Sequence, residues 1–328
     1  MRALVTGASG FTGGYMVQNL FQHGHRVRVF VRTMSNIEKL KTMPVEFAFG
    51  QLQNKEEIAS AMQDIDVVFH IAALYRAANL PDSAYWETNV MGTENVMEAA
   101  LKNGVKRVVH CSTGGVHGHI EDPPADEDTP FSPGDVYQDS KLEAEKIAFY
   151  YQREKGLPVT VVRPIGIYGP GDLRMLKMYR LIQDRKFIMF GDGNALYHLT
   201  YVTDAVEGFR LAAEAEKAVG KAYIIGGERY ITLNQFAEII AAELNVAPPA
   251  MHFPVWPLYV AGFVCEKVCI PLRLQPPIFR RRVDIFTKDR AFDISKAKRE
   301  LGYQPKIDME EGIHLTAQWY VNNGHLKS

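Results

Sequence analysis

The sequence predicts a doubly wound α/β fold, in which helices cover both faces of a parallel sheet. Short β-branched runs alternate with longer segments of helical periodicity, which is typical of parallel strands joined by helical crossovers. The 328 residues, 47% hydrophobic and 23% charged, are enough to bury a sizeable core. After Pro164 the pattern becomes less regular. We therefore expect a large sheet domain with a smaller, interleaved C-terminal lobe.

Six parallel strands and the helices between them follow from these patterns. We expect the strands at Ala3–Thr6, Arg26–Val31, Val45–Phe49, Val67–Ile71, Arg107–Cys111 and Val159–Arg163. We expect the helices at Tyr15–His23, Glu56–Met62, Thr88–Lys102 and Tyr137–Lys155. Acids and prolines from Glu121 to Gly134 indicate a long surface loop. Residues 1–165 and roughly 198–220 would form the sheet domain, and residues 166–197 and roughly 221–328 the second lobe.

Charge and cysteine content exclude several classes of partner. The formal net charge of −1 creates no global field that would attract nucleic acid. The three cysteines, Cys111, Cys265 and Cys269, are too few for a disulfide framework or a zinc site. We therefore expect no metal, and a reducing cytoplasm. The chain runs from Met1 directly into a glycine loop, so we expect no signal peptide.

The most apolar later segment, Phe253–Leu274, predicts a surface or lobe helix rather than a transmembrane helix. Prolines and charged residues interrupt it at Pro254, Pro257, Glu266, Lys267 and Pro271. Two interpretations stay open: a helix packed in the second lobe, and a contact with a membrane surface.

A glycine-rich loop follows the first strand and predicts a dinucleotide site. The residues Thr6-Gly7-Ala8-Ser9-Gly10-Phe11-Thr12-Gly13 give a G-x-x-G-x-x-G spacing that leads into a helix. Glycines let the backbone approach a pyrophosphate, and the helix N-terminus offers it N–H donors and partial positive charge. This strand, loop and helix context favours a dinucleotide over an unrelated glycine turn.

The residue at the end of the second strand indicates which dinucleotide is bound. An acidic residue there would bind the ribose 2′-hydroxyl of NAD, but this chain has Arg32. A cation favours the 2′-phosphate of NADP, so we expect NADP(H), with NAD(H) as the alternative. Lys39 and Lys41 could add to the pocket, although a solvated helix face explains them better.

A tyrosine and a lysine four residues apart predict a proton-transfer pair. Tyr137 and Lys141 lie one turn apart at the start of a predicted helix and so share one face. A free tyrosine, with a pKa of about 10, is a poor base at neutral pH, but a nearby cation stabilises its phenolate. Tyr137 could then remove a hydroxyl proton while hydride leaves for nicotinamide, and return it in the reverse reaction.

With the segment Cys111-Ser112-Thr113 between these two motifs, the chain resembles the extended short-chain dehydrogenase/reductase superfamily over nearly its whole length. Further motifs carry the resemblance: His70-Ile71-Ala72-Ala73, Asp126-Glu127-Asp128-Thr129-Pro130, Arg163-Pro164, Ile167-Tyr168-Gly169-Pro170-Gly171-Asp172 and Leu301-Gly302-Tyr303. The resemblance implies that Thr113, with Ser112 as the fallback, binds the reacting oxygen. It also implies that Asn89 supports the active-site geometry and a proton relay, although a simple polar residue near a helix start explains Asn89 almost as well.

The resemblance implies a Rossmann-type domain and further site residues. The cofactor contacts would be Gly7, Ser9, Gly10, Phe11, Thr12, Gly13, Arg32, Gln51, Leu52, Ala72, Ala73, Tyr137, Lys141, Pro164, Gly166 and Ile167. Gln51 stands where the family usually has an adenine-contacting Asp. The substrate contacts would be Tyr75, Gly114, Tyr168, Tyr197 and Arg290. The family also implies a homodimer that forms through the helices near Thr88–Lys102 and Tyr137–Lys155.

The motifs favour one branch of the family. Sugar-nucleotide dehydratases carry Asp-Glu where this chain has Gly114-Gly115, so dehydration is not expected. Nucleotide-sugar epimerases have an Asn and an Arg where this chain has Gly166 and Tyr197, but other cations remain available to a substrate diphosphate: Arg174, Arg280, Arg281, Arg282 and Arg290. The segments 163–172 and 292–305 look more like the branch of 3β-hydroxysteroid dehydrogenases, sterol C4-decarboxylases and dihydroflavonol reductases.

These observations predict an oxidoreductase for a secondary alcohol or ketone on an apolar, sterol-like or other lipid-like or polyketide-like small molecule. The alternative within the family is a nucleotide-sugar 4-epimerase that keeps NAD(P) bound. A non-catalytic, NADP-sensing regulator is the alternative from another class, and it would more naturally lack the pair of Tyr137 and Lys141.

Overall fold

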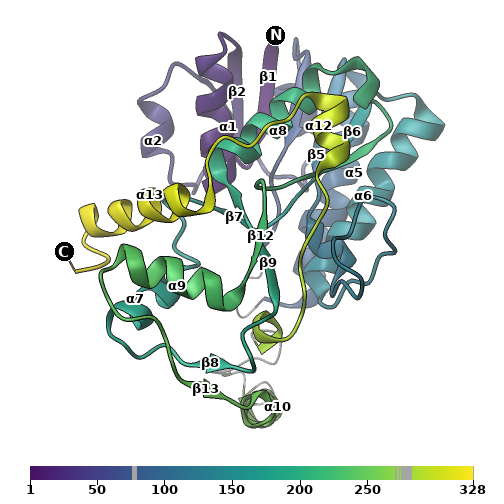
Figure 1. Cartoon of the computed structure of the whole chain (residues 1–328). Coiled ribbons are helices and arrows are strands. Elements are labelled where there is room, and N and C mark those ends of the chain that lie inside the picture. The colour runs from purple at the N-terminus through teal and green to yellow at the C-terminus, as the bar shows by residue number, and fades with distance from the viewer. Residues whose placement is uncertain (76–79, 270–271, 273, 275–282, 328) are drawn as a thin grey trace.

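A seven-stranded parallel sheet forms the centre of the computed structural model, which describes the chain except for residues 76–79, 270–271, 273, 275–282 and 328 (Figure 1). The strand order is β11-β6-β5-β4-β1-β2-β3. The strands are β1 (Arg2–Thr6), β2 (Arg26–Val31), β3 (Glu46–Phe49), β4 (Val67–His70), β5 (Arg107–Cys111), β6 (Val159–Pro164) and β11 (Ala222–Ile225). The first six were expected, but the expected number was too small, because β11 pairs with β6 at the sheet edge. The fold class is confirmed.

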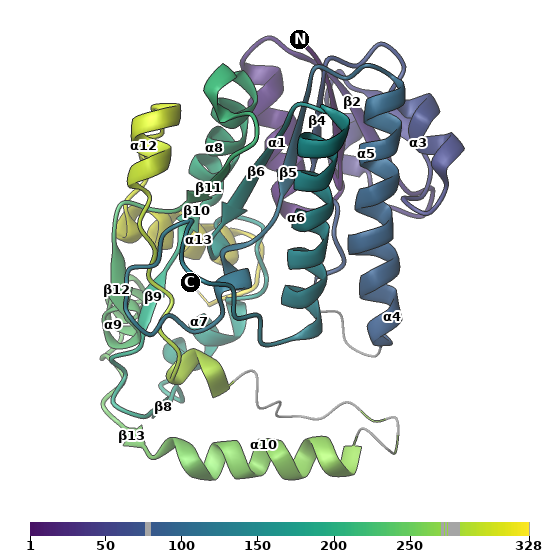
Figure 2. The ribbon, with the colours of Figure 1, turned by 90° about the vertical axis from the view of Figure 1, so that its right-hand side faces the viewer.

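Helices cover both faces of this sheet (Figure 2). One face carries α1 (Phe11–Gln22), α8 (Val202–Glu214) and α12 (Ser295–Leu301), and the other α3 (Lys55–Ala61), α5 (Gly92–Lys102) and α6 (Val136–Lys155). The inner strands are buried on both faces, so alternate side chains enter different cores. In β1, Ala3 and Val5 join the core beneath α1 and α8, whereas Leu4 joins the core beneath α3 and α5. The remaining short elements on this side are α2 (Glu38–Lys41), α4 (Asp82–Tyr85), a π-helix (Trp86–Met91) and two 3-10 turns (Gly114–His117 and Glu216–Ala218).

Helix α6 begins and ends where its sequence requires. The Asp135 carboxylate accepts a hydrogen bond from the Gln138 N–H at 2.9 Å and caps the first turn. At the other end Gly156 takes a left-handed conformation with φ of +71° and ends the helix. Tyr137 and Lys141 therefore lie in the first two turns of a firmly bounded helix.

A second lobe has a core of its own, separate from the two cores of the sheet. Its short strands pair as β7 (Ile167–Tyr168) with β10 (Thr200–Tyr201), β9 (Leu196–His198) with β12 (Tyr230–Thr232), and β8 (Met189–Phe190) with β13 (His252–Phe253). Its helices are α7 (Leu176–Gln183), α9 (Leu233–Glu243), α10 (Val255–Cys269), a 3-10 turn (Asp284–Phe286) and α13 (Met309–Asn322). The exact division between the two lobes stays a prediction.

The expected loop and the apolar segment are both present in the structure. Residues 121–134, all of them described, form a loop in which an isolated bridge joins Ala125 to Phe292. The apolar segment forms α10, which runs along the lower end of the molecule, away from the sheet (Figure 2). Among the described residues of α10 only Gly262 is buried, so of the two interpretations left open, packing within the lobe is not observed. Among the described residues, no helix is long and apolar enough to cross a membrane.

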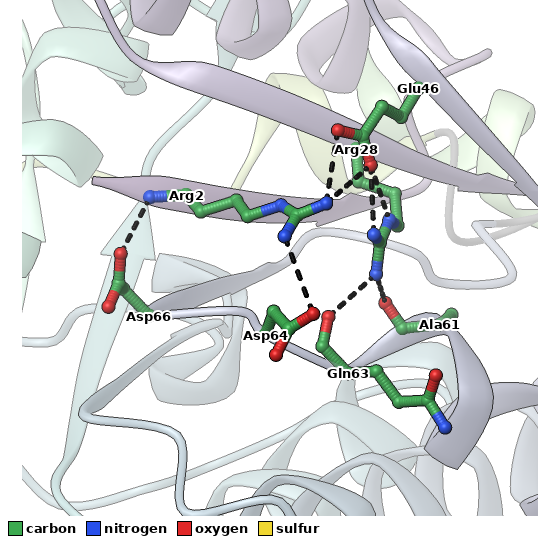
Figure 3. A network of polar contacts seen from close by, with 7 residues as sticks. All are labelled: Arg2, Arg28, Glu46, Ala61, Gln63, Asp64 and Asp66. Atoms are coloured by element: carbon green, nitrogen blue, oxygen red, sulfur yellow. Dashed lines mark hydrogen bonds and ion pairs between the residues drawn. The ribbon is translucent and has the colours of Figure 1, made fainter.

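Ion pairs and hydrogen bonds join the first halves of β1, β2 and β3 (Figure 3). The Arg28 guanidinium donates to the Glu46 carboxylate at 2.8 Å and to two backbone carbonyls before β4. Arg2 also donates to Glu46, at 3.1 Å, and its N–H donates to Asp66 at 2.8 Å. These contacts join β1, β2 and β3 and the turn before β4, but partial exposure limits what each contributes to stability.

A buried ion pair joins α6 to β6. Arg163 and Glu145 approach to 2.6 Å, and their side chains are only 4% and 2% exposed. The Ser112 hydroxyl, directly after β5, donates to the same carboxylate at 2.6 Å. Arg163 also donates to the Glu127 carbonyl oxygen at 2.9 Å, which attaches the loop 121–134. One carboxylate therefore organises the ends of two neighbouring strands.

We expect Glu145→Gln to lower the free energy of unfolding by about 3 kcal/mol or more, because it leaves the Arg163 charge buried without a counter-ion. The matched control is Glu143→Gln in the same helix, since Glu143 pairs with Lys146 on the surface. We expect this control to change stability by less than about 1 kcal/mol. Urea unfolding measures both, and an equal effect of the two substitutions would contradict the inferred role of the buried pair.

Candidate active site

The glycine loop packs so closely that two of its positions require glycine. Gly7 has a φ of +74°, and a Cβ atom there would lie 2.7 Å from the Ala72 nitrogen. A Cβ atom on Gly13 would lie 2.1 Å from the Gly7 carbonyl oxygen. The Gly10 N–H donates to the same oxygen at 2.9 Å and closes the turn. The loop thus directs the N-terminal end of α1 toward the carboxyl ends of β1 and β4.

A buried polar chain fixes these strand ends. The Thr6 and Thr93 hydroxyls lie 2.9 Å and 3.0 Å from the two ring nitrogens of His70. The Thr6 hydroxyl oxygen also accepts the Ala72 N–H at 3.2 Å. Burial, with a smaller contribution from the Lys141 charge, lowers the pKa of His70 to about 3, so this histidine is neutral at physiological pH. It therefore has a structural role beside the loop.

A cavity of about 790 Å³ opens in front of the glycine loop. It follows the carboxyl ends of the strands, where ligands bind in doubly wound sheets. Every residue expected to contact the cofactor lines it: Gly7, Ser9, Gly10, Phe11, Thr12, Gly13, Arg32, Gln51, Leu52, Ala72, Ala73, Tyr137, Lys141, Pro164, Gly166 and Ile167. The backbone cradle and the helix N-terminus fit a dinucleotide diphosphate, because side chains there would fill the space a phosphate needs.

The proton-transfer pair lies in the same cavity. Lys141 is buried and donates from Nζ to the Cys111 carbonyl oxygen. Burial lowers the pKa of Lys141, and the nearby Cys111 and Glu145 partly oppose this shift. The Tyr137 ring meets the Tyr75 ring edge to face, with centroids 4.9 Å apart. The structure therefore brings Tyr75, Tyr137 and Lys141 together at one end of the cavity.

The structure separates the roles of the two candidate hydroxyls after β5. Ser112 and Thr113 both line the cavity. The Ser112 hydroxyl is buried and donates to Glu145 at 2.6 Å. The Thr113 hydroxyl oxygen accepts the Gly115 N–H at 3.1 Å and is less buried. This geometry favours Thr113 over Ser112 as the group that contacts a substrate oxygen.

Asn89 lies in the π-helix Trp86–Met91, behind the cavity wall. Its side-chain oxygen accepts the Leu74 N–H at 2.7 Å, and its amide group donates to the Leu74 carbonyl oxygen at 3.1 Å and to the Ser140 hydroxyl at 2.9 Å. Asn89 thereby ties the segment after β4 to α6. Its expected part in a proton relay stays a prediction, because these contacts do not reach the Lys141 amine directly.

Four of the expected substrate residues lie outside the cavity lining, and Tyr75 lies within it. Tyr168 is buried in the second lobe against Tyr201, with ring centroids 5.6 Å apart. Tyr197 packs against Phe236 and forms a bridge with Arg290, and Gly114 is buried. Their contact with a substrate stays a prediction. Arg280, Arg281 and Arg282 lie outside the described residues.

The cavity lining also includes polar and charged residues that the sequence did not assign to the cofactor. Glu87 and Thr88 line it from the π-helix, and Arg174 lines it from the loop after β7. Glu87 and Thr88 directly precede Asn89 in the chain, and this adjacency was the available signal. Among the described residues, no three His, Cys, Asp or Glu side chains form a group that could hold a metal ion.

Comparisons with known proteins agree with this geometry. Residues 3–226 match the family described as NAD dependent epimerase/dehydratase. The 3beta-hydroxysteroid-dehydrogenase/decarboxylase isoform 1 of Arabidopsis thaliana is 30% identical over 359 residues, covering 99% of this chain and 80% of that protein. A putative dihydroflavonol 4-reductase of Synechocystis sp. is 28% identical and covers 99% of this chain and 96% of that protein.

Solved structures share the whole architecture. The crystal structure of gox2253 gives a TM-score of 0.85 at 31% identity and covers 99% of both chains. The dTDP-glucose 4,6-dehydratase DesIV from Streptomyces venezuelae, solved with NAD bound, gives a TM-score of 0.79 at 26% identity over 98% of both chains. The resemblance drawn from the motifs is thus confirmed. The protein belongs to the NAD dependent epimerase/dehydratase family and is an enzyme of this extended short-chain dehydrogenase/reductase group, whose typical cofactor is NAD(P).

Proposed function

We propose that the protein is an NAD(P)(H)-dependent oxidoreductase that interconverts a secondary alcohol and a ketone on an apolar, sterol-like or other lipid-like or polyketide-like substrate. One observation carries this proposal: Tyr137, Lys141 and Thr113 line the same cavity as the glycine loop. A proton-transfer group and a dinucleotide cradle in one cavity are the two requirements of hydride-transfer chemistry. The Arabidopsis relative is named as a hydroxysteroid dehydrogenase/decarboxylase and the Synechocystis relative as a putative dihydroflavonol reductase. These names support an apolar alcohol or ketone as the substrate of this protein.

The side chains suggest how the reaction proceeds. Thr113 donates a hydrogen bond to the substrate oxygen and orients the alcohol toward Tyr137. The Tyr137 phenolate, stabilised by the Lys141 ammonium, accepts the hydroxyl proton, and the C–O single bond becomes a carbonyl. The bound nicotinamide ring supplies the site that accepts the hydride. In the reverse direction Tyr137 returns the proton to the substrate oxygen.

The two residues after Thr113 argue against dehydratase activity. Gly114 and Gly115 stand where the sugar-nucleotide dehydratases have two acids. A Cβ atom at Gly114 would lie 2.6 Å from the Ile165 side chain, so the position has no room for a carboxylate without a shift of Ile165. The proposed chemistry is therefore net oxidation or reduction.

A nucleotide-sugar 4-epimerase that retains its NAD(P) is the second candidate. The charged Glu87 in the cavity lining suits a polar substrate and favours this candidate. Gly166 and Tyr197 replace the epimerase Asn and Arg, which counts against it. The placement of Tyr137 and Lys141 in the cavity counts against a non-catalytic NADP-sensing regulator.

We infer a preference for NADP(H) from the end of β2. Arg32 lines both the main cavity and an adjoining cavity of about 390 Å³, which also contains Thr33 and Gln51. Ser35 lines the main cavity close by in the chain. A guanidinium with hydroxyls beside it suits a 2′-phosphate. The Glu57 carboxylate also lines the adjoining cavity. One of its oxygens accepts a hydrogen bond from the Gln51 N–H at 2.8 Å, so part of this carboxylate is already paired with a backbone donor.

We also propose that α10 contacts a membrane surface. Many of its apolar side chains are exposed, with exposed fractions of 69% for Trp256, 52% for Val264 and 54% for Val268. Contact with water is unfavourable for an apolar surface of this kind. Trp256 and Tyr259 are residue types that favour the lipid–water interface. In the sequence, Lys267, Arg273 and Arg280–Arg282 add cations that suit anionic lipids. Such a contact would bring an apolar substrate close to the enzyme.

Two further expectations stay predictions. A homodimer through α5 and α6 is supported by apolar side chains exposed on or beside these helices, such as Met91, Leu101 and Tyr150. The cytoplasmic location rests on the few cysteines in the sequence.

We expect Tyr137→Phe to lower turnover at least about 100-fold, since it removes the proton-transfer group. Binding of NADPH should stay within a few-fold of the wild type. The assay follows NADPH absorbance with a panel of hydroxysteroids, 2-hydroxyketones, flavonols and UDP-sugars, and analyses the products. Conversion of a UDP-sugar to its 4-epimer without net change in NADPH would instead establish the epimerase.

We expect Arg32→Asp to weaken NADPH binding about tenfold or more while NADH binding is retained or improved, because a carboxylate repels the 2′-phosphate and accepts a 2′-hydroxyl. Fluorescence titration with each dinucleotide measures this. The control is Arg26→Asp, at the exposed start of the same strand. Equal binding of NADH and NADPH, both by the wild type and by the Arg32→Asp variant, would contradict the preference for NADP(H).

We expect the protein to co-sediment with phosphatidylcholine vesicles, and more strongly when they contain phosphatidylserine. Trp256→Glu combined with Phe263→Glu should weaken this binding at least about tenfold, because each apolar side chain contributes about 1.5–3 kcal/mol on burial. The control is Phe21→Glu, a similarly exposed position in α1. If the control and the α10 variant sediment alike, α10 does not dock on lipid.

A further inference from the structure

The loop after β7 is fastened over the beginning of α1. The Tyr15 hydroxyl, in the second turn of α1, donates to the Pro170 carbonyl oxygen at 2.9 Å. A Cβ atom at Gly171 would lie 3.8 Å from the Phe11 ring, so the loop backbone is in contact range of the first residue of α1. The loop therefore has a fixed position beside the glycine loop, although the two segments are far apart in the sequence.

This loop presents one guanidinium group to the cavity. Arg174 lines the cavity, and its guanidinium carbon lies 5.8 Å from the centre of the Phe11 ring and 5.4 Å from that of Tyr75. These distances are typical of cations over aromatic rings. Arg174 is thus placed where the glycine loop meets the catalytic end of the cavity.

A buried aspartate orients this guanidinium. Asp172 is 3% exposed and accepts from Arg174 Nε at 2.7 Å and from Nη2 at 3.0 Å. Tyr320 of α13 donates to the Asp172 carbonyl oxygen and so links the loop to the second lobe. Asp172 takes the Nε and Nη2 edge, Nη2 also donates to the Ile167 carbonyl oxygen, and the Tyr75 side chain forms a hydrogen bond with the same guanidinium. The side chain is therefore preorganised rather than a mobile surface arginine.

The positive charges of the cavity follow the length of a dinucleotide. Of the described lining residues, Arg32, Lys141 and Arg174 carry positive charge. Arg32 lies at the end of β2, and Lys141 lies beside Tyr137. Arg174 contacts Phe11, whose helix start faces the diphosphate in the proposed binding mode. Its charge thus lies near the middle of the bound molecule, where the dinucleotide carries its diphosphate charge.

We propose that Arg174 binds the diphosphate of the nicotinamide dinucleotide and so completes, from the second lobe, an anion site that the glycine loop begins. This inference rests on the proposed binding of NAD(P)(H) and adds a residue to it. The helix start supplies N–H donors and a partial charge, and Arg174 adds a full charge with planar donors that match phosphate oxygens. The contact spans the two lobes, so cofactor binding and the position of the second lobe become linked.

A diphosphate fits this position better than a substrate carboxylate. The Tyr75 ring contacts both the Arg174 guanidinium and the Tyr137 ring, so Arg174 is one aromatic ring away from the reacting hydroxyl. Its other aromatic neighbour, Phe11, belongs to the phosphate-binding loop itself. A substrate anion would therefore have to extend past Tyr75 toward the cofactor.

The test measures dinucleotide binding to the whole protein without any substrate. We expect Arg174→Met to raise the Kd for NADPH and for NADH alike, by about tenfold, since a hydrogen bond to a charged group contributes about 1.5–3 kcal/mol. Arg174→Gln should have a similar effect, since it also removes the charge. Lys177→Met, in the neighbouring helix α7 and outside the cavity lining, is the matched control and should leave both Kd values unchanged.

The pattern of effects identifies the anion. Loss of the diphosphate contact weakens both dinucleotides equally, whereas loss of a 2′-phosphate contact at Arg32 weakens NADPH alone. The melting temperature of each Arg174 variant shows whether it is folded. If a folded variant binds both dinucleotides with Kd values within twofold of the wild type, the proposal is overturned. A change confined to the KM of a substrate overturns it too. If the wild type binds neither dinucleotide, the proposed function fails together with this inference.

Discussion

The buried ammonium of Lys141 is the interaction on which the site depends. A buried ammonium group needs a hydrogen-bond acceptor. Lys141 donates to the Cys111 carbonyl oxygen, at the end of β5. One turn further along α6, Glu145 binds Ser112, the residue after Cys111, and pairs with Arg163 of β6. Successive turns of one helix therefore fix the same strand end, and the geometry of Thr113 follows from both.

The remaining half of the site depends on close backbone packing rather than charge. Gly7 and Gly13 let the first loop lie against the segment after β4, and Asn89 secures that segment to α6 through Leu74 and Ser140. The cradle for the dinucleotide and the proton-transfer pair are thus parts of one connected structure. The segment 72–75 contacts both parts, through Ala72 beside Gly7 and through Tyr75 beside Tyr137.

Residues that line the cavity were predictable from the sequence where they lie close together in the chain. The glycine loop and the pair of Tyr137 and Lys141 each lie within one strand–loop–helix unit, so a few residues determine their geometry. Arg174 reaches the cavity only because Tyr15 and Phe11 hold a distant loop beside α1, which no local pattern records. The strand β11 was missed because four apolar residues resemble a buried helix segment as much as a strand. For α10 the sequence left lobe packing and a membrane-surface contact both open, because apolar composition does not tell whether a partner covers a helix.

The position of β11 has a consequence for the order of folding. This strand pairs with β6, yet residues 167–214, which include β7 to β10, α7 and α8, are synthesised between them. A nascent chain that has emerged only as far as α8 exposes the backbone edge of β6, a strand that is buried on both faces in the finished protein. Protection of this edge by a chaperone, or its capture by the wrong strand, would decide the yield of folded protein during translation.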